Sequence, residues 1–228
     1  MTSEKTIGRL VVYRRLLNDL KAQGVASVHS QRLAELARGT AAQVRRDLMG
    51  LGQYGTPTHG YDVVRLLEGL REYLDSPKTQ GIALVGIGHL GQAILSYFAG
   101  RRPRLAIQVA FDKAPARIDC TLHHCPCHSI DRLEAVLHEM NLKLAIVAVP
   151  AESAQEITDR LVKAGVRGLV NFAPAPLKTP ENVFVENIDI TTSIEKVAFF
   201  AMQRTRVGGR NRTTAASRRV PNQEVRAP

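Results

Sequence analysis

The chain has 228 residues, of which 44% are hydrophobic, so its length suits one large domain or two small ones around a buried core. No apolar run approaches the roughly 20 residues of a membrane-spanning helix. Three clustered cysteines do not make the framework of a disulfide-rich secreted protein. We therefore expect a cytoplasmic protein with no membrane partner.

The formal net charge of +10 is unevenly distributed along the chain. Residues 1–80 contain 12 Lys and Arg against 8 Asp and Glu, residues 81–203 contain 12 of each, and residues 204–228 contain 7 Arg against one Glu. An excess of positive charge at both ends suggests contacts with a polyanion there. A merely soluble basic surface would give the same excess, so charge alone leaves both interpretations open.

The first part of the chain shows the pattern of a winged helix. Apolar spacing predicts three helices at residues 6–24, 31–37 and 41–48 and a fourth at 62–74. The glycines of residues 50–61 predict a tight hairpin between the third and fourth helices. Ser30 and Thr40 are the expected N-caps of the second and third helices. Helix-turn-helix followed by a hairpin describes a winged helix-turn-helix domain, which we place at residues 1–77.

From Gly81 the pattern changes to short apolar strands alternating with helices. Strands are expected near residues 82–85, 105–111, 126–130, 144–149, 168–171 and 183–186, with helices at 90–99, 132–140 and 152–164. This alternation predicts a doubly wound parallel sheet of the Rossmann type, at residues 78–190. A last helix at 193–203 carries Phe199 and Phe200, and the composition of residues 207–228 predicts a basic, disordered tail.

A glycine-rich motif follows the first of these strands and consists of Gly86, Ile87, Gly88, His89, Leu90 and Gly91. Gly86 permits a tight turn out of the strand, Gly88 lets the backbone approach a pyrophosphate, and Gly91 allows close packing of helix on strand. The helix that follows offers unpaired N–H groups to phosphates. The strand before the motif and the helix after it make this an expected dinucleotide site.

Asp112 supplies the acidic residue that such a site requires, 21 residues after Gly91 and at the end of the next strand. A carboxylate there accepts hydrogen bonds from the adenosine ribose hydroxyls and repels a 2′-phosphate. We therefore expect NADH and NAD⁺ rather than the phosphorylated cofactors, although Lys113 weakens this discrimination. The alternative is that Asp112 is a turn residue that closes the strand.

The remaining strand ends offer little proton chemistry. Val149 and Pro150 follow one buried strand and residues 171–174 (NFAP) follow the next, at the edge of the sheet where a dinucleotide lies. Prolines fix the shape of these loops but transfer no protons. Because no histidine, lysine or tyrosine stands in an evident catalytic pairing, we expect no catalytic residues and favour a dinucleotide sensor over an enzyme.

Cysteines and histidines are concentrated in residues 120–128 (CTLHHCPCH), with six potential metal ligands among nine residues. Such a density suggests zinc. The pair Cys125 and Cys127 is C-x-C rather than C-x₂-C, however, and no second ligand pair lies downstream. The segment also fits a strand with alternate residues on opposite faces. We therefore predict no metal site, and leave a thiol or metal sensor as the weaker alternative.

The sequence resembles the Rex family of redox-sensing transcriptional repressors over about residues 6–203. The segments that carry this resemblance are residues 9–16 (RLVVYRRL), 41–48 (AAQVRRDL), 60–63 (GYDV), 86–91 (GIGHLG), 149–151 (VPA), 171–174 (NFAP) and 185–189 (VENID). The resemblance implies a homodimer whose C-terminal helix, residues 191–206, is exchanged between subunits. It also implies a repressor that binds operator DNA when NADH is low and is released by NADH.

The resemblance further implies two sets of functional residues. A redox-sensing network near the nicotinamide would consist of Arg15 from the partner's winged helix, Tyr97 and Asp189. The recognition helix would contact double-stranded DNA through Thr40, Gln43, Arg45 and Arg46. Arg46 departs from the lysine that is usual in the family, which puts the base preference in doubt, and residues 57–59 (PTH) replace a frequent Arg-Gly in the wing. The Arg-rich tail is expected to restore non-specific affinity for DNA.

A rival hypothesis is a small NAD-dependent oxidoreductase with a basic N-terminal oligomerisation module. Substrate-dependent hydride transfer would distinguish it from a repressor.

Overall fold

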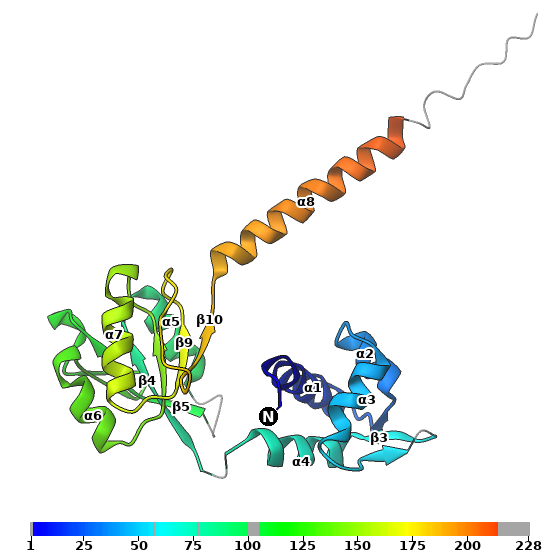
Figure 1. Cartoon of the computed structure of the whole chain (residues 1–228), viewed down its shortest axis with the longest axis horizontal. Coiled ribbons are helices and arrows are strands. Elements are labelled where there is room, and N and C mark those ends of the chain that lie inside the picture. Colours follow the sequence, from blue (N-terminus) through cyan, green and yellow to red (C-terminus); the bar gives the residue numbers. More distant parts are fainter. Residues whose placement is uncertain (1, 57, 77, 100–104, 214–228) are drawn as a thin grey trace, which may run out of the picture. The chain divides into compact units, whose positions relative to one another are not determined.

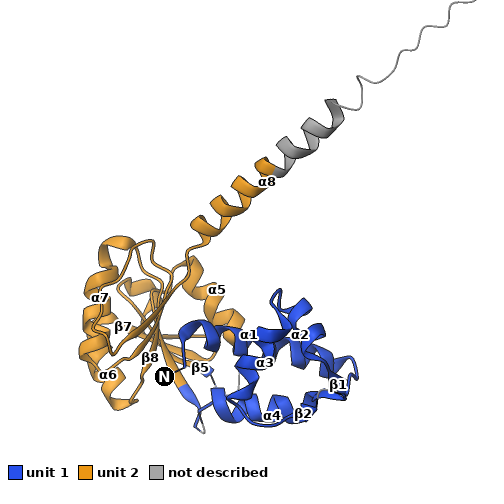
Figure 2. Ribbon diagram, turned by 45° about the vertical axis from the view of Figure 1, so that its right-hand side comes forward, with its two compact units in different colours: residues 1–80, 102–105 blue, residues 81–101, 106–228 orange. Residues whose placement is uncertain are grey.

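The computed structural model describes residues 2–56, 58–76, 78–99 and 105–213, with side chains described as far as Gln203 (Figure 1). The chain divides into two compact units, the first made mostly of residues 1–80 and the second of residues 81–101 and 106–228 (Figure 2). Among the described residues, no helix is long and apolar enough to cross a membrane.

The first unit has the predicted winged helix-turn-helix elements. They are α1 (Glu4–Ala22), β1 (Ser27–Val28), α2 (Ser30–Leu36), α3 (Ala41–Met49), β2 (Gly55–Thr56), β3 (Gly60–Asp62) and α4 (Val63–Leu74). The three strands form an antiparallel sheet in the order β1-β3-β2. Apolar side chains of the four helices are buried together, as the helical spacing predicts, and include Leu10, Leu17, Leu33, Val44, Leu48, Leu66 and Leu70.

The helix starts follow elementary capping chemistry, with one correction. Thr40 caps α3 by accepting the N–H of Gln43 at 3.2 Å, as predicted. Ser30, the predicted N-cap of α2, is instead the first residue of that helix, and His29 precedes it without a side-chain cap. The prediction was one residue too late because serine at the start of a helix also suits the first turn, so spacing alone does not fix the cap.

A buried carboxylate ties α3 to α1. Asp47, whose side chain is 2% exposed, accepts hydrogen bonds from Arg9 Nε at 2.6 Å and Arg9 Nη2 at 2.8 Å. The Tyr13 hydroxyl donates to it at 3.0 Å and the Gln43 amide at 2.7 Å. The guanidinium of Arg9 lowers the pKa of Asp47, with further help from the Gln43 and Tyr13 bonds. The third helix is therefore held in a fixed orientation by a fully satisfied buried charge.

The second unit is a seven-stranded sheet with helices on it. Its strands are β4 (Gln80–Val85), β5 (Leu105–Asp112), β6 (Cys120–Leu122), β7 (Cys125–Ser129), β8 (Leu144–Val147), β9 (Gly168–Asn171) and β10 (Phe184–Asn187). The order across the sheet is β10-β9-β8-β4-β5-β7-β6. From β4 the chain first moves outward through β5 and β7 and then returns to place β8 on the other side of β4. This reversal is the switch point where doubly wound sheets bind ligands.

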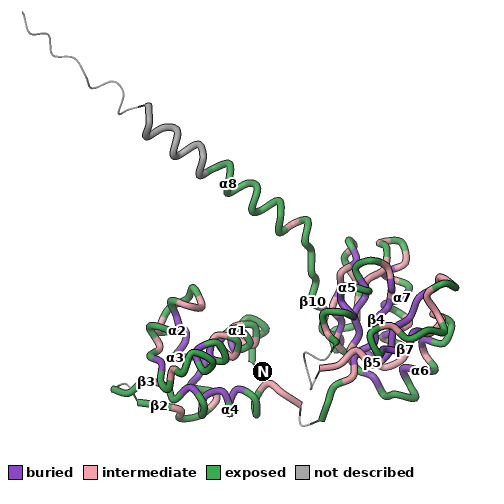
Figure 3. Tube along the Cα trace, turned by 180° about the vertical axis from the view of Figure 1, so that it is seen from behind, coloured by how far each residue is buried: buried purple, intermediate pink, exposed green. Residues whose placement is uncertain are grey.

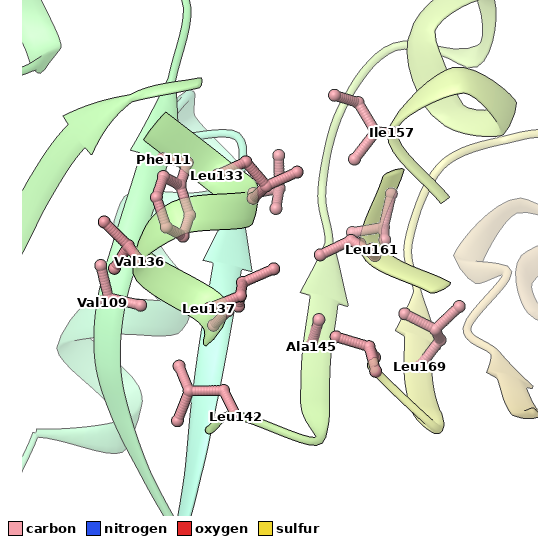
Figure 4. Packing of buried hydrophobic residues seen from close by; sticks show 14 of the residues in the cluster. Val109, Phe111, Leu133, Val136, Leu137, Leu142, Ala145, Ile157, Leu161 and Leu169 are labelled. Carbon is pink, nitrogen blue, oxygen red and sulfur yellow. The ribbon is translucent and has the colours of Figure 1, made fainter. Parts of the chain in front are cut away.

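The helices of this unit are α5 (His89–Phe98), α6 (Leu133–Glu139), α7 (Ala151–Lys163) and α8 (Ile190–Thr213), with short 3₁₀ turns at η1 (Pro115–Arg117) and η2 (Ile130–Arg132). In Figure 4, Leu133 of α6 lies beside Phe111 of β5, and Leu161 of α7 lies near Leu169 of β9. The sequences of the central strands are almost continuously apolar, because neighbouring strands flank them and helices cover the sheet. This packing fixes the edge of the sheet on which the loops lie.

The hairpin of β6 and β7 is an element that the sequence did not predict in full. The expected strand at residues 126–130 corresponds to β7, but its antiparallel partner β6 was not predicted as a strand. The connecting residues, His123 and His124, both have positive φ, of 49° and 65°. Such turns usually use Asn-Gly, so two histidines give no sequence signal for a hairpin.

The final helix is longer than predicted. It runs from Ile190 to Thr213, so residues 207–213 are helical although their composition predicted the start of the basic tail. Adding a residue to an existing helix forms one more hydrogen bond, and no proline interrupts this stretch. Residues 214–228, the rest of the predicted tail, lie outside the described residues. Asp189 caps the helix by accepting the Thr192 N–H at 2.9 Å.

We expect Asp47→Asn to lower the free energy of unfolding by about 2 kcal/mol at pH 7, because the substitution leaves Arg9 without its charged partner. The pKa of Asp47 is lowered in the folded state. The stabilisation is therefore fully present above the unfolded-state pKa of about 3.9 and is lost as the pH falls through the lower folded-state value. Urea denaturation followed by circular dichroism between pH 3 and 7 measures this difference.

Asp19→Asn is the matched control, since Asp19 is exposed on α1. It should change stability by less than about 0.5 kcal/mol. A destabilisation by Asp47→Asn that is the same at pH 3 and pH 7 would contradict the role given to the carboxylate.

Candidate functional site

The turn between β4 and α5 brings three backbone segments together at Gly86. Its φ is +98°, and its N–H donates to the carbonyl oxygen of Phe111 at 2.8 Å. A Cβ at this position would lie 2.4 Å from the Ala148 carbonyl oxygen, so only glycine fits. A Cβ at Gly91 would lie 2.0 Å from the Gly86 carbonyl oxygen. These two glycines are required by the packing of the turn itself.

Gly88 is different, because a Cβ built there would meet nothing within 4 Å. It is the N-cap of α5, whose first turn carries no acidic side chain. The helix therefore presents its N–H groups and the positive end of its dipole toward open space. A glycine that the protein's own packing does not require, at the start of a helix, fits the close approach of a phosphate group.

Asp112 holds this loop in place. Its carboxylate accepts the Ile87 N–H through Oδ2 at 2.7 Å and the Ala114 N–H through Oδ1 at 2.8 Å. The residue is 8% exposed, and Arg117 Nη1 lies 3.6 Å from Oδ2. The predicted contact with ribose hydroxyls stays a prediction. The two hydrogen bonds show that the carboxylate of Asp112 holds the glycine loop at the end of β5.

A cleft of about 680 Å³ opens where β4, β5 and β8 end. Of the predicted cofactor-binding residues, its lining contains Gly86, Gly88, His89, Leu90, Asp112, Val149 and Pro150. Ile87 is fully buried behind the loop, and Gly91 packs against Gly86. The volume is typical of small-molecule sites.

A second cleft of about 670 Å³ adjoins the first, since Leu90, Phe172 and Pro174 line both. It is formed by the loop after β9 and the segment between β10 and α8, and Asp189 is among its lining residues. Two adjoining clefts separated by the start of α5 suit an elongated ligand with a ring system at each end and phosphates between. The residues present therefore fit a dinucleotide.

The predicted redox-sensing residues lie in three places. Asp189 lines the second cleft, and its hydrogen bonds from the side chain and backbone of Thr192 lower its pKa. Tyr97 lies on α5, is 56% exposed and lines a third, apolar hollow with Phe98 and Phe172, and Phe172 also lines the two clefts. Arg15 is exposed on α1 of the first unit. The network of these residues stays a prediction.

The predicted DNA-contacting residues all lie at or on α3. Thr40 is its N-cap, and the Gln43 amide donates to Asp47 at 2.7 Å, so that side chain is held against the helix. Arg45 and Arg46 are exposed. Arg45 Nη1 donates to Ser30 Oγ at 3.1 Å, and Arg45 also lines a hollow of about 400 Å³ with residues of the hairpin. The two arginines are the side chains of this set that can extend to a ligand.

The sequence analysis did not single out Asp47 or Arg117. The position of Asp47 could have been recognised, because a carboxylate near the C-terminus of a helix opposes the helix dipole and needs a cationic partner. Arg117, which lies beside Asp112, gave no such signal. It is the last residue of the short turn η1, so its position depends on that turn.

The cysteines of residues 120–128 lie on the β6–β7 hairpin. Burial raises the pKa of Cys125 to about 12 and the pKa of Cys127 to about 11, so both thiols stay protonated at neutral pH. Cys120 is exposed. In the described part of the chain, no group of three or more His, Cys, Asp or Glu side chains could hold a metal ion.

Comparisons with known proteins agree with this division of the chain. Residues 2–48 match the family described as a putative DNA-binding protein N-terminus, and residues 77–175 match the family described as a CoA binding domain. A redox-sensing transcriptional repressor Rex from Roseiflexus sp. is 40% identical over 194 residues, which cover 85% of this chain and 88% of the relative. The Rex of Carboxydothermus hydrogenoformans is 39% identical over 196 residues, covering 86% of this chain and 94% of the relative.

Solved structures give the same result. The crystal structure of RSP, a Rex-family repressor, matches with a TM-score of 0.82 and 29% identity, covering 92% of this chain and 99% of that one. RSP in complex with β-NAD⁺ and operator DNA matches with a TM-score of 0.82 and 28% identity, covering 96% of this chain and 99% of that one. With curated relatives near 40% identity over most of its length, the chain belongs to the Rex family of redox-sensing transcriptional repressors.

Proposed function

We propose that this protein is a transcriptional repressor that binds operator DNA when NADH is low and leaves it when NADH is high. The observation that carries the proposal is the open Gly88 turn at the switch point of the sheet, in a chain whose other unit is a winged helix. RSP structures have been solved with β-NADH and with β-NAD⁺ and operator DNA, which supports both ligands. Repression places the protein with the chromosome, in the cytoplasm.

The cofactor acts as a signal in this proposal and not as a reactant. Gly86, Ile87, Gly88, His89, Leu90 and Gly91 form the pyrophosphate loop, and Asp112 fixes it to β5. Val149 and Pro150 border the same cleft from the end of β8. NAD⁺ and NADH differ by one positive charge and by the planarity of the nicotinamide ring, so groups near that ring decide which form of the protein is stabilised.

We assign the sensing of the nicotinamide to Asp189, and its position in the lining of the second cleft supports this assignment. With Tyr97 and Arg15 of the partner subunit it forms the proposed redox network. A carboxylate that can pair with a cation in one arrangement and a tyrosine hydroxyl in another is an electrostatic two-state element. Such an element changes the DNA-binding population only through different affinities of NADH for the two states.

DNA recognition is assigned to α3. Its N-cap Thr40 and the residues Gln43, Arg45 and Arg46 lie where a recognition helix enters the major groove. Arg46 can make a bidentate contact to guanine, whereas Arg45, hydrogen-bonded to Ser30, is suited to a phosphate. Asp47 ties α3, which carries these residues, to Arg9 of α1, and it also holds the Gln43 amide.

The dimer is assigned to α8. Its described side chains are almost all exposed (Figure 3), and the apolar ones are Ile190, Ile194, Val197, Phe199, Phe200 and Met202. An exposed set of this size indicates a protein interface. An apolar hollow of about 440 Å³ on α5, β8 and β9 offers a matching surface on the second unit. We assign the two surfaces to each other across a homodimer in which α8 is exchanged between subunits.

Gly88→Ala should weaken NADH binding by at least about tenfold while leaving thermal stability unchanged, because the added Cβ meets no protein atom but stands in the path of the pyrophosphate. Gly91→Ala should lower both, because its Cβ would collide with the Gly86 carbonyl oxygen. Nicotinamide fluorescence and thermal unfolding measure the two properties.

Gly39→Ala, where the added Cβ also meets nothing, is the control and should change neither property. Wild-type NADH affinity in Gly88→Ala would place the pyrophosphate elsewhere.

Binding to a pseudo-palindromic DNA duplex, followed by fluorescence anisotropy, tests the function as a whole. Added NADH should release the DNA and added NAD⁺ should not. Arg46→Ala should weaken DNA binding by about 1–3 kcal/mol, because it removes a cation and its base contact, while NADH affinity stays the same.

Arg32→Ala is the control for this measurement, since Arg32 is exposed on α2 and paired with Glu35. It should alter DNA binding by less than about threefold. DNA affinity that does not respond to NADH at any concentration would rule out the proposed function.

The double variant Phe199→Glu with Phe200→Glu should be monomeric by light scattering, because two charges would be buried in the proposed interface. Glu195→Gln with Lys196→Gln changes neighbouring polar positions of α8 and should remain dimeric. A dimer that persists in the phenylalanine variant would exclude α8 from the interface.

A further inference from the structure

The β6–β7 hairpin places two cysteines directly opposite each other. Cys120 of β6 pairs with Cys127 of β7 in the antiparallel register. The side chains of directly opposed residues project from the same face of a sheet, and their Cα atoms lie about 4.5–5.5 Å apart. A disulfide requires a Cα separation of roughly 4.4–6.8 Å. The backbone of the hairpin therefore already holds Cys120 and Cys127 at a spacing that a disulfide can bridge.

The third cysteine of the hairpin is less well placed for a bond. Cys125 pairs with Leu122, so it lies diagonally across from Cys120. Diagonal neighbours in a sheet are about 7–8 Å apart, which is too far for a disulfide. Cys125 and Cys127 are two residues apart on one strand, about 6.6–6.8 Å, at the upper limit of the allowed range. Cys120 and Cys127 are thus the pair that the register favours.

The two opposed thiols differ in their exposure to solvent. Cys120 is exposed, and β6 is the last strand at one end of the sheet in the described part of the chain. Cys127 is 1% exposed. Burial raises the pKa of Cys127 to about 11, and the nearby Cys120 thiol adds to that rise, which places the two side chains close together. An oxidant in solution therefore meets Cys120 first, and Cys127 reacts with a partner inside the fold.

We propose that Cys120 and Cys127 form a reversible dithiol that hydroperoxides oxidise to a disulfide, a reaction site separate from the dinucleotide clefts. The bond would join two strands that are already paired, so it forms without a change of fold. Disulfides in reducing compartments are usually transient and redox-sensing, which fits a hairpin that holds both thiols ready. The protein would then react directly with an oxidant, in addition to its proposed response to NADH.

The reaction takes two steps. The Cys120 thiolate attacks one oxygen of a hydroperoxide ROOH, the O–O bond breaks, and Cys120 becomes a sulfenic acid while the alkoxide leaves as ROH with the proton that the thiol gave up. The Cys127 sulfur then attacks the Cys120 sulfur, so that an S–S bond forms and the S–O bond breaks. The hydroxyl group leaves as water with the Cys127 proton. Two thiols lose two electrons in total, and one hydroperoxide is reduced to ROH and water.

Counting thiols in the full chain tests the proposal. Ellman's reagent, applied after denaturation, should find three thiols in the reduced protein and one after treatment with a slight excess of hydrogen peroxide. Dithiothreitol should restore all three, because thiol–disulfide exchange reverses the bond. Three thiols that persist after peroxide treatment would overturn the proposal.

Peptide mapping identifies the bonded pair. All three cysteines lie in one tryptic peptide, residues 118–132, which chymotrypsin cuts after Leu122. The two halves of this peptide from the oxidised protein should stay linked until they are reduced. Halves that separate without reduction would show a bond between Cys125 and Cys127, and a bond between two chains on non-reducing electrophoresis would place Cys120 in an intermolecular bond. Either result would overturn the proposal.

Three variants assign the roles of the cysteines. Cys120→Ser should keep both remaining thiols after peroxide treatment, and this exposed position tolerates serine without loss of the fold. Cys127→Ser should stop at the sulfenic acid of Cys120, which dimedone labels. Cys125→Ser is the matched control and should still form the disulfide, so that its two thiols fall to none. Oxidation that Cys120→Ser leaves unchanged, or a disulfide that still forms in Cys127→Ser, would refute the assignment.

Discussion

The close approach of backbone at Gly86 is the constraint on which the second unit depends. Its N–H reaches the Phe111 carbonyl oxygen, while the Ala148 N–H reaches the Val85 carbonyl oxygen, both at 2.8 Å. The ends of β4, β5 and β8 are therefore joined at one point. The loops that follow these strands open on the same edge of the sheet, and α5 begins there with its N–H groups directed outward. The first cleft is a consequence of this junction.

Each unit contains a buried carboxylate that holds its neighbours in place, and the two carboxylates differ in the groups that donate hydrogen bonds to them. Asp112 is satisfied by backbone N–H groups and so depends on the course of the chain. Asp47 is satisfied mainly by the side chains of Arg9, Tyr13 and Gln43, and so depends on their identities. In both cases the charge is compensated where it is buried, because an unpaired carboxylate would cost several kcal/mol. Asp112 fixes the glycine loop, and Asp47 fixes α3.

Most helices and strands could be predicted because burial imposes a period on the sequence, and the glycine motif because Gly86 and Gly91 admit no Cβ. The predictions failed where composition and spacing are poor guides to the structure. The His123–His124 turn carries no turn signal, and α8 continues through residues whose composition favours disorder. The direction of the Asp112 carboxylate could not be predicted either, since spacing gives the position of a residue along the chain and not the partners of its oxygens.

The apolar side chains of α8 bear on how steeply operator occupancy rises with the concentration of the protein. If their burial requires a second copy, the folded dimer is stabilised by mass action, and its melting temperature rises with protein concentration. Below the dissociation constant of the dimer, occupancy of a two-half-site operator grows with the square of protomer concentration. In the proposed homodimer, α8 would thereby set the protein concentration at which repression begins.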